Sequence, residues 1–208
     1  MTNKLTRFEE RYATGQIPWD HALPPPEVQA IVSTLTPGRA LDIGCGYGRA
    51  AIFLAQEGWE ADGVDFVPQA IEGAQQRAAA VGLSSEQVRF HCADVTRLEF
   101  LHPAYDFALD VGCLHSLEEE DLQRLHGELG RLLRPGALFM LFAHLRDPEA
   151  EVDAERPRGI LEETLRRVLL HGDGAGFREE KVEYGTTTLP DGTSYASAWF
   201  WLRRRSES

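Results

Sequence analysis

The most constraining feature of this chain is a glycine-rich turn that follows a short apolar run. Residues 40–43 are apolar apart from Asp42, and glycines stand at positions 44, 46 and 48. Glycines let the backbone turn sharply and let a ligand approach bare main chain. Residues 50–55 then read as a helix. The turn therefore lies between a predicted strand and a predicted helix, where open α/β sheets bind their ligands.

The charge of Asp42 narrows the choice of ligand. A dinucleotide site places pyrophosphate at the glycine turn and the helix N-terminus, where the partial positive charge favours an anion. Asp42 would repel that pyrophosphate, and the spacing G-x-G-x-G departs from the dinucleotide pattern G-x-G-x-x-G. S-adenosylmethionine fits better, since it carries an α-ammonium and a sulfonium but no phosphate. We therefore predict that Asp42, Gly44, Cys45 and Gly46 bind this cofactor.

Two further predicted strands also end in acids. The strand over residues 60–65 ends at Asp65, which is predicted to accept hydrogen bonds from two ribose hydroxyls, and Phe66 is predicted to lie against the adenine. After the strand over 88–94, Asp94 is predicted to accept from the adenine amine while the Val95 N–H donates to a ring nitrogen. An aspartate in such a place also commonly caps a following helix or turn. Three acids in register with three strand ends favour the cofactor site.

With these motifs the chain resembles the class I S-adenosylmethionine-dependent methyltransferases, and among them the small-molecule members of the thiopurine and tellurite type. The resemblance covers roughly residues 28 to 205 and is specific for fold and cofactor but weak for substrate. It implies an α/β fold with a doubly wound, Rossmann-like and mostly parallel seven-stranded sheet that ends in an antiparallel hairpin. The matching segments are residues 41–49, 63–66, 93–95, 105–110 and 132–138.

The order of predicted elements agrees with that fold. Strands alternate with helices near 47–58, 68–82 and 118–133, and this alternation is typical of a parallel doubly wound sheet. Two strand-like runs, 177–189 and 194–205, flank a Pro-Asp-Gly sequence that predicts a hairpin turn. We expect residues 28–208 to form one methyltransferase domain.

Residues 1–27 precede the first element of that domain. Tyr12, Ile17 and Trp19 form an aromatic and apolar cluster in a stretch that glycine and proline interrupt. The resemblance implies that this segment folds over the cofactor as a lid, with Tyr12 and Trp19 in contact with it. The alternative is an arm that packs onto the core for stability.

The end of the fourth strand is the expected place for the methyl acceptor. Backbone carbonyls around Val111 and Gly112 are predicted to receive the cofactor ammonium, and Asp110 either lines the acceptor pocket or holds that ammonium through water. His115 is the candidate general base, because an imidazole titrates near neutral pH; a histidine there can instead cap a helix or fill a polar gap. The Asn- or Asp-Pro-Pro-aromatic tetrapeptide typical of enzymes that methylate amino groups of nucleic acids is not found here.

Composition restricts the partners. With 208 residues the chain suits one domain, and its net charge of −12 opposes a nucleic-acid partner. The sequence contains no apolar run of 18 residues and no apolar signal core near its start, so we expect no membrane span and a cytoplasmic location. Three scattered cysteines predict neither a disulfide framework nor a zinc site, and no metal is expected. The choice between monomer and homodimer stays open.

These observations favour an enzyme that transfers a methyl group from S-adenosylmethionine to a sulfur, oxygen or nitrogen atom of a small molecule by in-line displacement. One alternative is a protein or peptide methyltransferase whose acidic face holds a basic partner. Another is a cofactor-binding protein without methylation activity. A nicotinamide dehydrogenase is disfavoured by Asp42 and by the glycine spacing.

Overall fold

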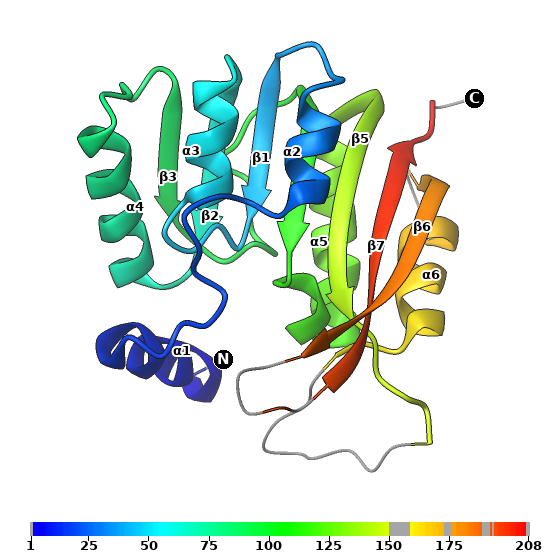
Figure 1. Ribbon diagram of the computed structural model, residues 1–208. Helices are drawn as coiled ribbons and strands as arrows, with labels where there is room; N and C mark the ends of the chain where they lie inside the picture. Colours follow the sequence, from blue (N-terminus) through cyan, green and yellow to red (C-terminus); the bar gives the residue numbers. More distant parts are fainter. Residues whose placement is uncertain (1, 150–158, 173–175, 189–191, 193, 207–208) are drawn as a thin grey trace. The chain divides into compact units, whose positions relative to one another are not determined.

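The computed structural model describes residues 2–149, 159–172, 176–188, 192 and 194–206 (Figure 1). The chain divides into two compact units after Val95. The elements of the first unit are α1 (Thr2–Thr14), α2 (Pro26–Val32), β1 (Arg39–Ile43), α3 (Arg49–Gln56), β2 (Glu60–Asp65), α4 (Pro68–Ala80) and β3 (Val88–Cys92). The elements of the second unit are β4 (Tyr105–Val111), the 3-10 helix η1 (Leu114–Ser116), α5 (Glu119–Leu132), β5 (Leu133–His144), α6 (Glu162–His171), β6 (Phe177–Thr188) and β7 (Ser194–Arg204).

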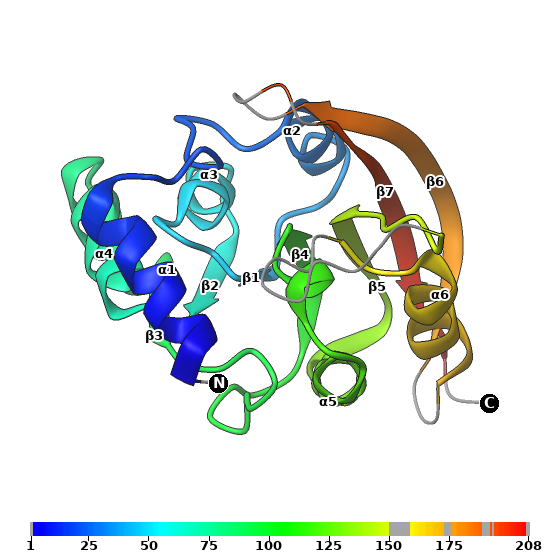
Figure 2. The same cartoon turned by 90° about the horizontal axis from the view of Figure 1, so that it is seen from below.

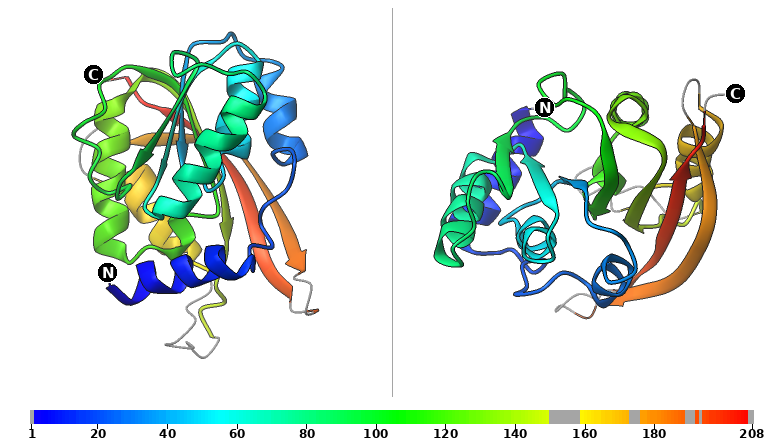
Figure 3. Two further views of the ribbon diagram at one scale, coloured as in Figure 1. Left: turned by 90° about the vertical axis from the view of Figure 1, so that its left-hand side faces the viewer. Right: turned by 90° about the horizontal axis from the view of Figure 1, so that it is seen from above.

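Three parallel strands form the sheet of the first unit in the order β3-β2-β1. Helices α3 and α4 cover one face of these strands (Figure 3). On that face the ring of Phe90 fills the space that two glycines leave. A Cβ atom on Gly63 would lie 2.8 Å from Phe90 Cδ1, and one on Gly48 would lie 2.6 Å from Phe90 Cε1. Phe90 therefore packs β3 against both β2 and the start of α3.

The N-terminal segment packs within the first unit. Leu5, Phe8 and Tyr12 recur at the spacing of one helix face, and α1 lies beside the start of α4 (Figure 2). The loop after α1 adds Ile17 and Trp19 to the same cluster. The packed side chains are Leu5, Phe8, Tyr12, Ile17, Trp19, Tyr47, Phe66, Val67 and Ala70.

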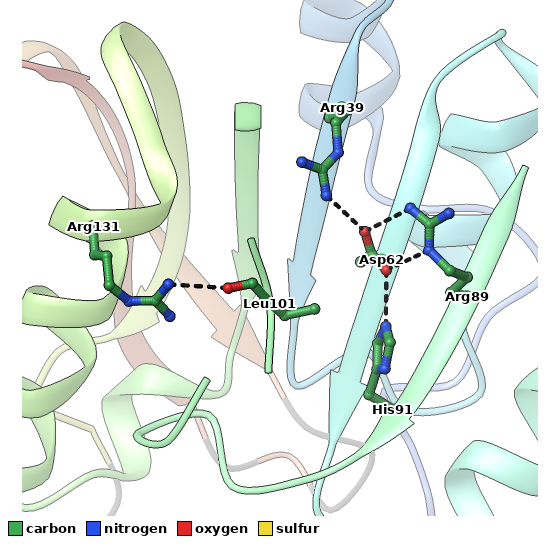
Figure 4. Close-up of polar contacts among 6 residues, drawn as sticks. All are labelled: Arg39, Asp62, Arg89, His91, Leu101 and Arg131. Atoms are coloured by element: carbon green, nitrogen blue, oxygen red, sulfur yellow. Dashed lines mark hydrogen bonds and ion pairs between the residues drawn. The ribbon is translucent and has the colours of Figure 1, made fainter. Parts of the chain in front are cut away.

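The sheet face opposite Gly63 carries a buried carboxylate. The side chain of Asp62 is only 2% exposed, and three cationic or titratable side chains of neighbouring strands surround it (Figure 4). Arg89 donates two hydrogen bonds to its oxygens at 2.9 and 3.1 Å. His91 Nε2 lies 2.8 Å from the same carboxylate, and a guanidinium nitrogen of Arg39 lies at 3.6 Å. The single negative charge thus holds together side chains that would otherwise repel one another.

Replacing Asp62 with asparagine should therefore lower the free energy of unfolding. We expect a loss of roughly 1–3 kcal/mol in urea unfolding, below the full cost of breaking a buried pair because Arg89 is 37% exposed and screened by solvent. The surface ion pair between Asp121 and Arg124 provides the control. Asp121→Asn should change stability by less than about 0.5 kcal/mol. An equal effect of both changes would contradict the role assigned to Asp62.

The sheet of the second unit is mixed, in the order β4-β5-β7-β6. Strands β4 and β5 are parallel, whereas β7 is antiparallel to both β5 and β6. Helices α5 and α6 contact each other and lie against one face of this sheet. His126 of α5 packs edge-on against Phe177, and Arg166 of α6 lies over the Phe200 ring. Arg131 of α5 donates to the Leu98 and Leu101 carbonyls before β4, and Figure 4 shows the second of these bonds.

The predicted fold class is confirmed. The described residues contain seven strands, three in the first unit and four in the second, and the last two form an antiparallel hairpin. Strand β5 begins at Leu133, which pairs with Tyr105 before the register shifts, so the predicted helix over 118–133 ends one residue earlier, at Leu132. Of the predicted hairpin turn, positions 190, 191 and 193 lie outside the described residues. Within the described part of the chain, no helix is both long and apolar enough to cross a membrane.

Candidate functional site

The glycine turn between β1 and α3 has the backbone that its sequence predicts. Gly44, Gly46 and Gly48 adopt φ values of +67°, +54° and +75°, a region that side chains with a Cβ rarely occupy. Gly48 is the N-cap residue of α3 but has no side chain to cap it. Asp42, at the end of β1, supplies the missing oxygen and accepts a hydrogen bond from the Ala51 N–H at 3.1 Å.

Asp42 is almost completely enclosed, with 3% of its surface exposed. Burial raises the pKa of its carboxyl group to about 7, against the opposing effects of the Ala51 hydrogen bond and the nearby Arg49 charge. An additional positive charge beside this carboxyl group would favour its ionised form. The electrostatic argument that Asp42 binds a positively charged cofactor therefore still applies, although its side chain also caps α3.

Asp65, the last residue of β2, holds the glycine turn that follows β1. One carboxylate oxygen accepts the Gly46 N–H at 3.0 Å, and the other accepts the Val67 N–H at 2.9 Å. The residue is 7% exposed, and burial raises the pKa of its carboxyl group. Each carboxylate oxygen has more than one lone pair, so a ribose hydroxyl can bind beside the backbone amides. The same side chain thus shapes the glycine turn and offers acceptors at the strand end.

Aromatic side chains of the N-terminal segment cover this region. Tyr12 is 7% exposed, and its hydroxyl oxygen would lie 2.9 Å from a Cβ atom on Gly46. Burial and the neighbouring Asp65 raise the pKa of the Tyr12 phenol. Tyr12 packs edge-on against Trp19 and Tyr47, with ring centroids 6.3 and 5.1 Å apart. The structure therefore brings Tyr12 next to two predicted cofactor-binding residues.

An ion pair that the sequence analysis did not predict links this segment to α4. Arg77 donates two hydrogen bonds to the Asp20 carboxylate, at 2.8 and 2.7 Å. Its guanidinium carbon lies 4.4 Å from the centre of the Tyr47 ring, a cation–π contact. Asp20 and Arg77 are 57 positions apart. No local pattern signals such a pairing.

The remaining predicted cofactor residues of the first unit lie at the same strand ends. Cys45 is buried inside the glycine turn, and its N–H donates to the Val64 carbonyl at 3.0 Å. Phe66 is half-buried and packs edge-on against Phe8, with centroids 5.6 Å apart. Asp94 and Val95 follow β3 in an irregular stretch and are half-buried and buried. The predicted roles of these residues toward the adenine stay predictions.

In the second unit, Asp110 is fully buried at the end of β4 and accepts the N–H groups of Cys113 and Leu114 at 2.8 and 2.9 Å. Asp110 thereby caps η1, and such capping is the alternative role given above for an aspartate at a strand end. Val111 is half-buried, and Gly112 takes a φ of +91°.

His115 lies in η1, and its Nδ1 atom accepts the His144 N–H at 3.2 Å. The two rings are stacked, with centroids 4.7 Å apart. His144 and its stacking neighbour Tyr195 are absent from the sequence prediction. Their contacts join β5 and β7, which no spacing in the sequence brings together.

Gly48→Ala tests the packing of the glycine turn. A Cβ atom there would meet the Phe90 ring at 2.6–2.7 Å and the Ala74 Cβ at 3.0 Å, and the residue would also keep a positive φ. We expect urea unfolding to show a loss of roughly 2–4 kcal/mol, because backbone strain and overpacking both contribute.

Gly82→Ala is the matched control for this change. Gly82 has a φ of +77°, but a Cβ atom added to it would meet no neighbouring atom within 4 Å. Only backbone strain of about 1–2 kcal/mol applies there. Equal losses at both glycines would show that the Phe90 contact contributes nothing.

Comparisons with known proteins find similarity to methyltransferases. A family model described as a methyltransferase domain matches residues 40–136. The 2-heptyl-1-hydroxyquinolin-4(1H)-one methyltransferase of Mycobacteroides abscessus is 26% identical over 89% of this chain and 86% of its own length. The S-adenosyl-L-methionine-dependent Diels-Alderase iccD of Talaromyces variabilis is 35% identical over 58% of this chain, but the match spans only 41% of that relative.

A solved structure supports the same fold. The 1,6-didemethyltoxoflavin-N1-methyltransferase of Burkholderia thailandensis superposes with a TM-score of 0.74 and 23% identity, over 97% of this chain and 87% of that one. The strands, the terminal hairpin and the glycine turn define a Rossmann-like methyltransferase fold. The chain is thus similar to S-adenosylmethionine-dependent methyltransferases, and the methyltransferase-domain match over residues 40–136 supports S-adenosylmethionine as the cofactor.

The residues of the first unit fit this cofactor. Asp65 offers a buried carboxylate to ribose hydroxyls, and the Tyr12 hydroxyl lies beside the backbone of Gly46 in the same region. Asp42 adds negative charge, which suits an ammonium and disfavours a pyrophosphate. This donor set matches a positively charged nucleoside amino acid.

Proposed function

We propose that the protein transfers a methyl group from S-adenosylmethionine to a sulfur, oxygen or nitrogen atom of a small molecule. The glycine turn anchored by Asp65 carries this proposal, because it joins bare backbone and a ribose-binding carboxylate at one strand end. A relative that aligns over most of both chains is named for a small hydroxyquinolone acceptor. The net charge of −12 supports a small acceptor over a nucleic acid. We propose that the protein acts in the cytoplasm.

The residues of the chain would bind and orient the reactants. When bound, the cofactor supplies an electrophilic methyl group. We propose that Asp65 holds the ribose, that Phe66, Asp94 and Val95 hold the adenine, and that Asp42 attracts the ammonium. Tyr12 and Trp19 would exclude water from the covered side. Positioning for in-line displacement contributes up to roughly 7–11 kcal/mol in well-oriented systems, so no covalent intermediate with the protein is required.

The hydrogen bond of His115 bears on its proposed role. Because Nδ1 accepts the His144 N–H, the neutral imidazole carries its proton on Nε2. In this tautomer His115 donates a hydrogen bond at Nε2. Acting as a base at Nδ1 would require the ring to leave His144. We therefore propose that His115 orients the acceptor while Asp110 holds η1 in place.

Calorimetry and a product assay test the proposed function together. The purified protein should bind S-adenosylmethionine and S-adenosylhomocysteine, and should release S-adenosylhomocysteine when supplied with a panel of thiols, phenols and hydroxyquinolones. NAD serves as the comparison ligand. Binding of NAD without any binding of S-adenosylhomocysteine would contradict the proposal.

A second candidate is a cofactor-binding protein that catalyses no methyl transfer. The observation in its favour is the 35% identity to a relative named as a Diels-Alderase that depends on S-adenosyl-L-methionine. The same assay distinguishes the two. Tight binding of S-adenosylmethionine, with no S-adenosylhomocysteine released for any acceptor in the panel, would favour this second candidate.

A further inference from the structure

Three rings of the second unit are stacked in nearly parallel planes. The His115 and His144 rings have centroids 4.7 Å apart and planes 17° apart. The His144 and Tyr195 rings follow at 5.6 Å and 16°. These side chains come from η1, from the end of β5 and from the start of β7, so three separate segments contribute one ring each.

The backbone fixes the first ring of this stack. A Cβ atom on Gly112 would lie 3.3 Å from His115 Cε1, so the imidazole packs tightly against the chain at this glycine. The His144 N–H then donates to Nδ1 of the same ring at 3.2 Å. These two contacts turn one edge of the imidazole toward the backbone and set the plane of the ring. The stack is therefore held by the local fold and not only by ring-to-ring packing.

The chemistry of the three rings differs from that of the core of the second unit. The core side chains Phe139, Phe177 and Phe200 are fully buried, whereas His115, His144 and Tyr195 are all half-buried. Imidazole and phenol rings have polar edges that are costly to enclose, and phenylalanine or leucine would pack there without that cost. The stack also lies at the carboxyl end of β4 and β5, the edge at which α/β sheets bind ligands. These properties are typical of a recognition surface.

We propose that the stack of His115, His144 and Tyr195 binds the methyl acceptor and selects a flat, conjugated one; this inference rests on the proposed function. Rings stacked in this way cover each other's faces, so a further flat ring can extend the stack only on the outer face of an end ring, His115 or Tyr195; there an aromatic ring gains stacking energy while a puckered ring does not. His144, at the centre, sets the common orientation of the other two rings. A planar bicyclic compound with a hydroxyl group or ring nitrogen as nucleophile is the acceptor class that fits.

Two probes of similar size test this inference. We choose 1-naphthol, which is flat, and decahydronaphthalen-1-ol, which is puckered; both are neutral at pH 7. Their binding is measured by calorimetry to the protein saturated with S-adenosylhomocysteine. Wild type should bind the flat probe at least tenfold more tightly than the puckered one. Tyr195→Leu and His144→Leu should weaken binding of the flat probe about five- to tenfold. Tyr195→Phe and His144→Phe keep a ring and should stay within about twofold of wild type.

Tyr184→Leu is the matched control, since Tyr184 lies on the same hairpin but is 62% exposed and bonded to Glu162 and Arg166. It should leave binding of both probes unchanged. Equal affinity of wild type for the two probes, no binding of the flat probe, or full retention of its binding by both leucine variants would each overturn the inference. Failure of wild type to bind S-adenosylhomocysteine would instead overturn the proposed function, so the two failures are separable.

Discussion

Asp42→Asn is expected to gain stability relative to wild type in the ligand-free protein when the pH is raised from 4 to 8. Burial raises the pKa of the Asp42 carboxyl group from 3.8 to about 7 in the folded protein. Between these values the unfolded chain loses the proton while the folded chain keeps it, so wild type loses stability as the pH rises through this window. Asparagine does not titrate, and its side-chain oxygen still accepts the Ala51 N–H.

Urea unfolding at pH 4 and pH 8 measures this effect. The stability of Asp42→Asn relative to wild type should grow by roughly 2–4 kcal/mol between the two conditions. Comparing the two pH values cancels any constant cost of burying the extra amide group. A constant difference between variant and wild type at both pH values would show that Asp42 titrates normally in the fold.

The same change should weaken cofactor binding. We propose that the ionised Asp42 attracts the ammonium of S-adenosylhomocysteine. Wild-type affinity should then rise as the pH increases from about 5.5 to 7.5, below the range where an α-amino group titrates. Asp42→Asn should flatten this dependence and reduce affinity about tenfold at pH 7.5, or about 1.4 kcal/mol. The control ligand is 5′-methylthioadenosine, which lacks the amino-acid part and should bind both proteins equally. If the affinity of wild type changed with pH in the same way for both ligands, the proposed attraction between Asp42 and the ammonium would be contradicted.

Asp65→Ala should reduce the affinity for S-adenosylhomocysteine at least tenfold in calorimetry, a loss of about 1.4 kcal/mol or more. The ribose hydroxyls lose a charged acceptor. In addition, the Gly46 and Val67 N–H groups lose their shared partner, which loosens the glycine turn. Hydrogen exchange at these two amides should therefore become faster in the ligand-free variant.

Asp62→Ala supplies the matched control on the same strand. Asp62 and Asp65 lie three residues apart on β2 and therefore face opposite sides of the sheet. The control should lower stability but leave cofactor affinity within about twofold. If Asp65→Ala binds S-adenosylhomocysteine as tightly as wild type, Asp65 does not belong to the cofactor site, whether or not hydrogen exchange at the two amides becomes faster.

Several parts of the structure follow from local sequence patterns. Strand β2 ends at Asp65 as predicted, because Pro68 begins α4 shortly after it. The left-handed turn was predictable since only glycine tolerates its φ values. The direction of a side chain was not predictable: Asp42 was assigned to the ligand by its charge, and the structure also uses it to cap α3.

Contacts between distant segments were beyond sequence reasoning. Arg77 reads as one more polar residue of α4, and only the folded unit places it against Asp20 and Tyr47. The ring stack on His115 has the same origin, because antiparallel pairing brings the start of β7 beside the end of β5. Periodicity within one segment carries no information about such pairings.

The packing of the N-terminal segment has a practical consequence for protein engineering. Phe8, Tyr12 and Trp19 share one apolar cluster with Val67 and Ala70, and Arg77 clamps the segment through Asp20. A truncation that begins at the first strand would strip aromatic cover from Asp65 and expose apolar surface to water. Shortened versions of the chain should then aggregate even though the whole glycine turn is retained.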